Sequence, residues 1–316
     1  MKPSERKKQI RTLWQKCFDD SEEFVEFYFE KVYRDENTLS LERAGRVVSA
    51  MQMIPYRMLW CETEITVAYV SGACTAPEVR GKGLMTELLH KAFREMRERG
   101  YDITALIPAS ESLFEYYSAY GYTEVFDYSL QVFERVEIPS TTGTMPFVLL
   151  DPNAGSCWFT YFDRQLRKRT SCILHSEDDF RNIITDVIID RGLVVGALNP
   201  DGNPAGMAFI TPSGGGAFIK EMFYDSEEIR ERLLQKAAEA FQTGKVAYKT
   251  PPVPPETQRY GMAMILNREK MIRQWLDVHP GTLLSKDALD RMDSASLAYH
   301  LFGYGQKKSG MNLMLD

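Results

Sequence analysis

Apolar residues recur along the first 137 positions at the spacings of helices and strands. A helical pattern runs from Ile10 to Phe18 behind the candidate cap Ser4, and Ser21 opens a second helix that is rich in aromatic residues. Apolar runs, one of them with a predicted break at Pro55, indicate several strands, which lead into a strongly amphipathic helix. The strands are predicted over residues 39–43, 46–60, 64–69, 70–75, 103–107 and 122–136, and the later helices over 84–99 and 111–119.

A similar order of elements follows a turn-rich cluster at residues 139–143. Helices are predicted over 158–166, 176–187 and 226–241, and strands over 193–198, 206–210 and 217–223. Because this order resembles that of the first half, we expect an internal structural repeat. With 316 residues, the chain also exceeds what one core usually serves. We predict domains at 1–137 and 145–276, and a short C-terminal segment at 277–316 with helices and a terminal strand or tail.

A basic, glycine-rich turn joins the strand that ends at Thr75 to the amphipathic helix. A helix start leaves backbone N–H groups unpaired and carries a partial positive charge, so it can bind a phosphate. Gly81 and Gly83 allow the backbone to approach a ligand closely, and Arg80 and Lys82 add positive charge. Neither GxxxxGK[ST] nor GxGxxG occurs here, which argues against an ATP or NAD site.

These residues resemble the acetyl-CoA motif of the GNAT acetyltransferases, Q/R-x-x-G-x-G/A, with Arg80 first and Gly83 fourth. Met85 stands where the family usually has Gly or Ala. A bulky residue at this position is similar to what the multidomain proteins of the enhanced-intracellular-survival type carry. The resemblance implies an α/β (α+β) class with tandem GNAT folds, each a mixed, mostly antiparallel sheet flanked by helices, and it implies acetyl-CoA as co-substrate. The cofactor-binding residues that it implies are Ala73, Cys74, Thr75, Arg80, Gly81, Lys82, Gly83, Leu84, Met85 and Thr86.

A second motif lies at residues 114–122, where the sequence is similar to the family's F-Y-x-K/R-x-G-F/Y element. The resemblance places Tyr117 at the position of the catalytic tyrosine, which would protonate the departing thiolate, while Ala119 replaces the usual basic residue. Acetyl transfer to an amine needs a polarised carbonyl, a neutral amine and this proton. Direct attack requires no nucleophilic side chain, so Cys74 is interpreted as a strand residue, with an acyl-enzyme role as the alternative.

The second half lacks the basic turn. Acidic residues at 225–228 occupy the equivalent helix start, where they would repel a pyrophosphate, so we do not expect CoA to bind there. The survival-type relatives use their terminal carboxylate as a base. By resemblance Asp316 is a candidate for that role, although a tail that only packs against the protein is the other interpretation.

Composition and net charge limit the kinds of partner that we expect the chain to bind. The net charge of −6 argues against nucleic acid, no apolar run is long enough to span a membrane, and no signal-peptide core is present, so we expect a cytoplasmic protein. The histidines are scattered and the five cysteines are widely spaced, so we predict no metal site. We expect the cysteines to be reduced, buried thiols. Phe24, Phe27 and Met53 are core residues or line an acceptor groove.

The predicted function is transfer of acetyl to a primary amine of a small or flexible acceptor. The alternatives are an aminoacyl-tRNA-dependent peptidyl transferase with a tandem GNAT fold and a non-catalytic CoA-binding or interaction protein. A homo-oligomer is possible by resemblance.

Overall fold

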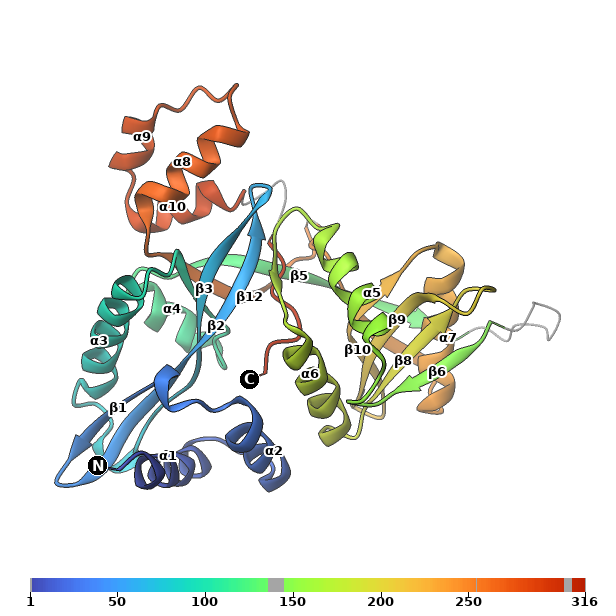
Figure 1. The fold of residues 1–316 in the computed structure, drawn as a ribbon, viewed down its shortest axis with the longest axis horizontal. Helices are drawn as coiled ribbons and strands as arrows, with labels where there is room; N and C mark the ends of the chain where they lie inside the picture. The colour runs from blue at the N-terminus through green and yellow to red at the C-terminus, as the bar shows by residue number, and fades with distance from the viewer. Residues whose placement is uncertain (1, 136–144, 254, 304–308, 316) are drawn as a thin grey trace. The chain divides into compact units, whose positions relative to one another are not determined.

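The computed structural model describes residues 2–135, 145–253, 255–303 and 309–315, and this part of the chain forms two compact units (Figure 1). The first unit consists of Met1–Val125 and Tyr260–Ser309, and the second of Phe126–Arg259 and Gly310–Leu315. Each unit combines helices with a mixed sheet, so the α/β class predicted from the sequence is correct.

The first unit contains seven α-helices among its described residues and a sheet in the order β1-β2-β3-β4-β12. The helices are α1 (Pro3–Cys17), α2 (Glu22–Phe27), α3 (Leu84–Glu98), α4 (Glu111–Ser118), α8 (Arg268–Val278), α9 (Lys286–Arg291) and α10 (Ser294–Leu301). The strands are β1 (Thr38–Arg43), β2 (Arg46–Trp60), β3 (Thr63–Thr75), β4 (Ile103–Leu106) and β12 (Gln258–Ile265). In the described part of this sheet, β1–β2, β2–β3 and β4–β12 are antiparallel pairs, whereas β3 and β4, which α3 connects, pair in parallel.

Local sequence explains where the first elements begin. Ser21 caps α2 by accepting a hydrogen bond from the backbone N–H of Phe24 at 3.1 Å, as expected. Ser4 is not a cap, because α1 already begins at Pro3, whose missing N–H costs nothing at a first helical position. The predicted break at Pro55 is also wrong: β2 is continuous, and Pro55 lies beyond the end of its pairing with β1 at Gln52, so no β1–β2 bond is lost.

The apolar stripe of α3 packs onto the sheet as its periodicity predicts. Leu88, Leu89, Ala92, Phe93 and Met96 are buried in one cluster with residues of β2, β3 and β4. Methionines of β12 join this cluster. The core of the first unit therefore includes a strand from far down the chain, which the predicted boundary at residue 137 does not allow for.

Helices α8, α9 and α10 form a small cluster, drawn in orange in Figure 1. They belong to the first unit, and a buried carboxylate holds α8 there. Asp102 is 0% exposed, and it accepts hydrogen bonds from Lys270 Nζ of α8 at 2.7 Å and from the Thr66 backbone N–H at 2.9 Å. This pairing satisfies a carboxylate that would otherwise be costly to bury.

The second unit has a sheet in the order β6-β8-β9-β10-β11-β5. Its strands are β5 (Thr123–Glu134, which begins in the first unit), β6 (Phe147–Leu150), β8 (Leu193–Leu198), β9 (Pro204–Ser213), β10 (Gly216–Tyr224) and β11 (Lys245–Thr250), together with the short β7 (Cys172–Leu174). Its helices are α5 (Ser156–Arg167), α6 (Glu177–Ile189) and α7 (Glu227–Ala240). As in the first unit, one strand pair, β10 and β11, is parallel and is connected by a helix.

The predicted domain boundaries differ from this division. The second half of β5, residues 129–134, pairs with β11, and the strand belongs to the second unit from Phe126 onward, whereas β12 pairs with β4 and belongs to the first from Tyr260 onward. The segment predicted at 277–316 is divided in the same way, since α9 and α10 lie in the first unit and residues 310–315 in the second. The predicted terminal strand is reduced to one bridge between Gly310 and Cys172, after which the tail packs by burying Met311, Leu313, Met314 and Leu315.

Strand β3 contains a β-bulge that determines its course. Gln52 pairs with Ser71 and Ala50 with Cys74, so Gly72 and Ala73 together face a single residue of β2. Gly72 has a φ of +59°, and a Cβ at this position would lie 2.1 Å from Cζ3 of Trp14. Only glycine fits both the backbone conformation and the space beside the indole.

We predict that Gly72→Ala lowers the free energy of unfolding by about 3 kcal/mol, because it combines overpacking with a positive φ. Denaturant unfolding of the purified chain measures the change. Gly45→Ala is the matched control, since its φ of +75° is similar but no atom lies within 4 Å, and it should cost only about 1 kcal/mol. Equal effects of the two substitutions would show that the Trp14 contact does not matter.

Candidate functional site

The candidate site begins where β3 leaves β4. The two strands pair in parallel only through Val67–Ile103, Ala68–Thr104 and Tyr69–Ala105. Beyond Tyr69, β3 continues for six residues to Thr75 with no described strand paired to it on that side. The backbone of residues 70–75 therefore has hydrogen-bonding capacity on that side that the described sheet does not use. The predicted residues Ala73, Cys74 and Thr75 lie on this segment.

The glycine-rich turn connects the end of β3 to α3. After a single 3-10 turn (Pro77–Val79), Gly81 and Gly83 adopt φ values of +73° and +74°, and Gly83 is the N-cap of α3. No side chain caps this helix start. A Cβ added at either glycine would meet no atom within 4 Å, so open space lies beside both. The turn thus leaves the helix N-terminus accessible to an anionic ligand.

The basic residues of the turn are exposed, as a site for an anion requires. Arg80 also has a local role, because its Nε donates a hydrogen bond to the Thr75 carbonyl oxygen at 3.0 Å. This bond fixes the turn against the end of β3. Lys82 lies between the two glycines and is likewise exposed.

The first turn of α3 carries the remaining predicted residues. Leu84 and Met85 are half-buried and pack against the core of the first unit, which accounts for a bulky side chain at the Met85 position. The Thr86 hydroxyl forms a short hydrogen bond with the Tyr120 hydroxyl. Tyr120 was not predicted, although the run of tyrosines from 116 to 122 is a signal that could have indicated it.

Tyr117 lies on α4 with its ring packed between those of Tyr116 and Tyr122, at centroid distances of 5.3 and 5.7 Å. The side chain is 7% exposed, and burial raises the pKa of Tyr117 to about 12. Its hydroxyl has no hydrogen-bond partner among the described residues, whereas the Tyr122 hydroxyl pairs with Thr104 Oγ1 at 3.0 Å. Tyr117 therefore retains a phenolic proton that the surrounding described residues do not use.

Two cysteines meet beside the end of β3. Cys74 is buried, and its hydrogen bond with the Cys17 thiol, together with burial, raises its pKa well above the usual value, so it does not provide a thiolate at neutral pH. Contact with Cys74 lowers the pKa of Cys17 to about 6, and the Cys17 thiol lies 3.5 Å from the Thr75 carbonyl oxygen. The prediction that all five thiols are buried is wrong, since Cys17 and Cys61 are half-buried and Cys157 is exposed.

The residues considered for an acceptor groove are placed in packed surroundings. Phe24 and Phe27 are buried, with ring centroids 6.3 Å apart, and Met53 belongs to the core cluster under α3. These positions fit the core interpretation, and a groove role stays a prediction. Asp316, the candidate base, lies outside the described residues.

In the described ranges, no group of three or more His, Cys, Asp or Glu residues could hold a metal ion. None of the helices described has the length and apolar character needed to cross a membrane.

Comparison with protein families identifies the first part of the chain. Residues 2–125 match the model of the acetyltransferase (GNAT) domain. This range contains β1 to β4, the glycine-rich turn, α3 and Tyr117. This match over residues 2–125 confirms the resemblance drawn from the two motifs.

Solved structures share the fold over most of the chain. A conserved protein from Enterococcus faecalis, described as a probable N-acyltransferase, matches with a TM-score of 0.70 at 14% identity, over 86% of this chain and 73% of its own. Eis1 from Mycobacterium abscessus matches with a TM-score of 0.65 at 12% identity, over 87% and 74%. A tandem GNAT protein from the clavulanic acid biosynthesis pathway matches at 0.50 and 12%, over 83% and 95%. No curated protein matches the sequence. At these identities the structural matches show the fold alone.

We predict that Cys17 is alkylated faster than Cys61 at neutral pH, because contact with Cys74 lowers the pKa of Cys17 to about 6, whereas burial raises that of Cys61 to about 12. Mass spectrometry after timed exposure to iodoacetamide measures both rates as a function of pH. The Cys17 rate should be half-maximal near pH 6, and Cys74→Ala should move this midpoint upward. A midpoint that stays in place in Cys74→Ala would exclude Cys74 as the cause.

Proposed function

We propose that the chain is an N-acetyltransferase that transfers acetyl from acetyl-CoA to a primary amine of a small or flexible acceptor. The observation that carries this proposal is the open glycine turn at the start of α3, located where β3 has separated from β4, within the residues that match the acetyltransferase (GNAT) domain. A strand with free backbone groups and an uncapped helix start are what an acyl-CoA needs for its pantetheine arm and its pyrophosphate.

The residues present fit acetyl-CoA. The N–H groups of Leu84, Met85 and Thr86 lie in the first turn of α3 and would bind the pyrophosphate, and the exposed Arg80 and Lys82 would contribute positive charge. The open space beside Gly81 and Gly83 would let the phosphates approach the backbone. The residues from Ala73 to Thr75 would bond the pantetheine arm and polarise the thioester carbonyl.

Tyr117 would supply the proton for the departing thiolate. A phenol whose pKa is raised to about 12 stays protonated at neutral pH, which is the form a general acid needs. The neutral acceptor amine would attack the thioester directly. Cys74 is unsuited to an acyl-enzyme, because its hydrogen bond with Cys17 and its burial keep the thiol protonated.

The second unit, in this proposal, is a degenerate GNAT-like repeat that does not bind CoA. Its parallel pair β10 and β11 is connected by α7, as β3 and β4 are by α3. At the start of α7, however, Ser226 accepts a hydrogen bond from the Ile229 N–H, and Glu227 and Glu228 follow. The helix start is therefore already capped and negatively charged, which disfavours a phosphate. The fold shared with a tandem GNAT protein supports this interpretation.

The test of the activity is release of CoA thiol from acetyl-CoA in the presence of polyamines, aminoglycosides or lysine peptides. The proposal expects turnover with at least one class of amine. Tight binding of acetyl-CoA in calorimetry without turnover would instead favour a CoA-binding protein. If acetyl-CoA neither binds nor turns over, the proposal is wrong.

We predict that Arg80→Glu weakens acetyl-CoA binding about tenfold or more, because it replaces a cation beside the proposed pyrophosphate position with an anion. Isothermal titration calorimetry measures the dissociation constant. Arg94→Glu is the matched control: it makes the same change of charge at an exposed position later in α3 and should leave the affinity close to that of the unaltered chain. Equal losses in both variants would point to net charge rather than to a site at the turn.

We predict that Tyr117→Phe lowers kcat about a hundredfold with little change in the affinity for acetyl-CoA, because it removes only the proposed proton donor. Steady-state kinetics and calorimetry separate the two effects. Tyr122→Phe is the control, since Tyr122 is buried in the same aromatic cluster but bonds Thr104, so its loss should reduce stability by about 1 kcal/mol and leave kcat largely unchanged. An unchanged kcat in Tyr117→Phe refutes the assignment.

A further inference from the structure

Two thiols meet where the end of α1 packs against the end of β3. Cys17 is the last residue of α1 and Cys74 is the last residue but one of β3, and their side chains are hydrogen-bonded to each other. The Cys17 Sγ also lies 3.5 Å from the carbonyl oxygen of Thr75, the residue next to Cys74. The acetyl transfer proposed above uses neither of these side chains.

The packing of α1 against β3 brings the two thiols together. Trp14 and Cys17 are three residues apart on α1, so they lie on one face of the helix. The Trp14 ring occupies the space beside Gly72 in the bulge of β3, and one helical turn later Cys17 contacts Cys74, which directly follows the bulge. Two adjacent contacts thus hold the helix in one register against the strand, and the pairing of the thiols follows from that register.

The two thiols differ in their access to solvent. Cys17 is half-buried and Cys74 is buried, so a small solute can reach the first thiol and meets the second only through it. Because Cys17 ends its helix and Phe18 is already extended, no further helical turn holds the backbone beyond Cys17. This freedom allows the sulfur atoms to approach to the bond length of about 2.05 Å that a disulfide requires.

The charged and titratable groups that face the Cys17 thiol are Cys74, Arg80 and Glu78. The hydrogen bond with Cys74 lowers the pKa of Cys17 to about 6, and Arg80 acts in the same direction, while burial and Glu78 oppose both. At neutral pH Cys17 is therefore mostly a thiolate, whereas Cys74 keeps its proton. One member of the pair is thus a nucleophile and the other a proton donor.

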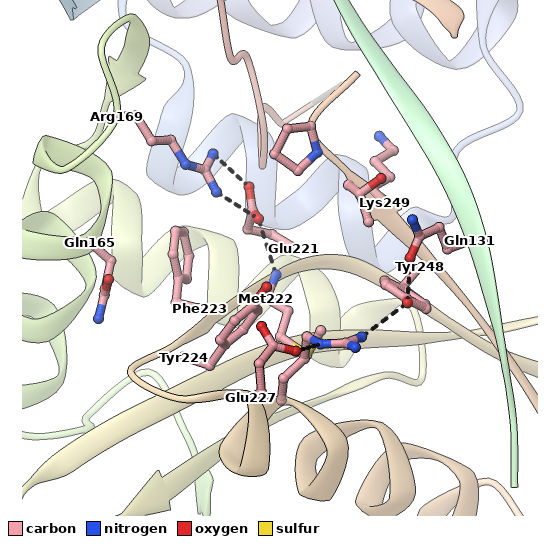
Figure 2. A pocket seen from close by; sticks show the side chains of 13 residues that line it. Gln131, Gln165, Arg169, Glu221, Met222, Phe223, Tyr224, Glu227, Tyr248 and Lys249 are labelled. Atoms are coloured by element: carbon pink, nitrogen blue, oxygen red, sulfur yellow. Dashed lines mark hydrogen bonds and ion pairs between the residues drawn. The ribbon is translucent and has the colours of Figure 1, made fainter. Parts of the chain in front are cut away.

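The second unit has an ion pair at a similar junction. Arg169 lies just after α5, the first helix described in that unit, and Glu221 directly follows the bulge of β10. The Arg169 guanidinium donates two hydrogen bonds to the Glu221 carboxylate, at 2.9 and 3.0 Å, and both side chains line a pocket of about 430 Å³ (Figure 2). Charges thus join helix end and strand in the second unit, and thiols join them in the first.

We propose that Cys17 and Cys74 are a redox-active pair that hydrogen peroxide converts to an intramolecular disulfide. The Cys17 thiolate attacks one peroxide oxygen and the O–O bond breaks, so Cys17 becomes a sulfenic acid and the departing hydroxide takes up a proton to form water. The Cys74 sulfur then attacks the Cys17 sulfur. The S–S bond forms, the S–O bond breaks, and the second hydroxide leaves as water with the Cys74 proton. Two thiols are oxidised, and one peroxide is reduced to two waters.

The first step prepares the second. The hydrogen bond with Cys17 is the largest cause of the raised pKa of Cys74, and it stabilises the Cys17 thiolate. Once Cys17 is an uncharged sulfenic acid, that cause is removed and Cys74 gives up its proton more readily. Oxidation also removes a negative charge beside Arg80. The proposal does not depend on acetyl transfer in the first unit.

The test exposes the full chain to hydrogen peroxide, blocks the remaining thiols with N-ethylmaleimide, and maps disulfides by mass spectrometry without reduction. Trypsin releases Cys61 and Cys74 in one peptide, residues 58–80, so a second protease that cleaves after Glu62 is added to separate them. The main linked product should join Cys17 to Cys74, and dithiothreitol should remove it. A non-reducing gel should show the oxidised chain at the position of the monomer.

The pH dependence and the variants test the order of the steps. Loss of the Cys17 thiol should slow about tenfold from pH 7 to pH 5, because the thiolate fraction falls below a pKa of about 6. Cys74→Ser should leave Cys17 as a sulfenic acid that dimedone labels, and Cys17→Ser should leave Cys74 reduced. Cys61→Ser is the matched control: Cys61 is also half-buried, and its loss should not change the yield of the Cys17–Cys74 disulfide.

The unaltered chain alone decides whether the disulfide forms, so the result stands even where a variant fails to fold. The proposal is overturned if peroxide produces no link between Cys17 and Cys74, or if other cysteine pairs are linked to the same extent. It is also overturned if Cys74 is oxidised as fast in a folded Cys17→Ser variant as in the unaltered chain.

Discussion

The bulge of β3 against Trp14 is the constraint on which the candidate site depends. At this bulge Gly72 and Ala73 face a single residue of β2, and the indole occupies the space that any side chain at position 72 would need. The bulge lies in the stretch of β3 that has already left β4, whose pairing ends at Tyr69. A bulge bends its strand and increases its twist, so it favours this separation. The separated strand then leads directly into the turn at the start of α3.

The elements of the site and the packing of the core depend on the same residues. The stripe of α3 that holds the helix to the sheet also fixes where its first turn points, and Met85 contributes to both, since it lies in that turn and packs against the core. Tyr117 is similar: its ring belongs to the core cluster, while its hydroxyl is not used by the described residues. A side chain held this tightly can place one proton accurately, because its ring has little freedom to move.

Local sequence patterns predicted most of the helices and strands. The features that they missed depend on pairing between segments far apart in the chain. The helix start at Gly83 and the cap at Ser21 depend on neighbouring residues, so the sequence alone located them. β12 pairs with β4, and β5 pairs with β11 of the second unit. Both pairings join strands that lie far apart in the chain, which the periodicity of a single segment does not reveal. The Tyr120–Thr86 and Cys17–Cys74 contacts were missed for the same reason, as each joins residues of different elements.

The two units show how one backbone geometry can serve different chemistry. In each unit, two parallel strands are paired over three residues. The longer of the two strands contains a bulge after the last paired residue. In the first unit the bulge contains a glycine and leaves backbone groups available, and the following turn is basic and open. In the second unit the bulge precedes Glu221, whose carboxylate binds Arg169, and the following helix start is capped and acidic. The side chains at the bulge and the helix start thus give the second unit a buried ion pair and a capped, acidic helix N-terminus in place of the open, basic turn, while each sheet keeps a parallel strand pair joined by a helix.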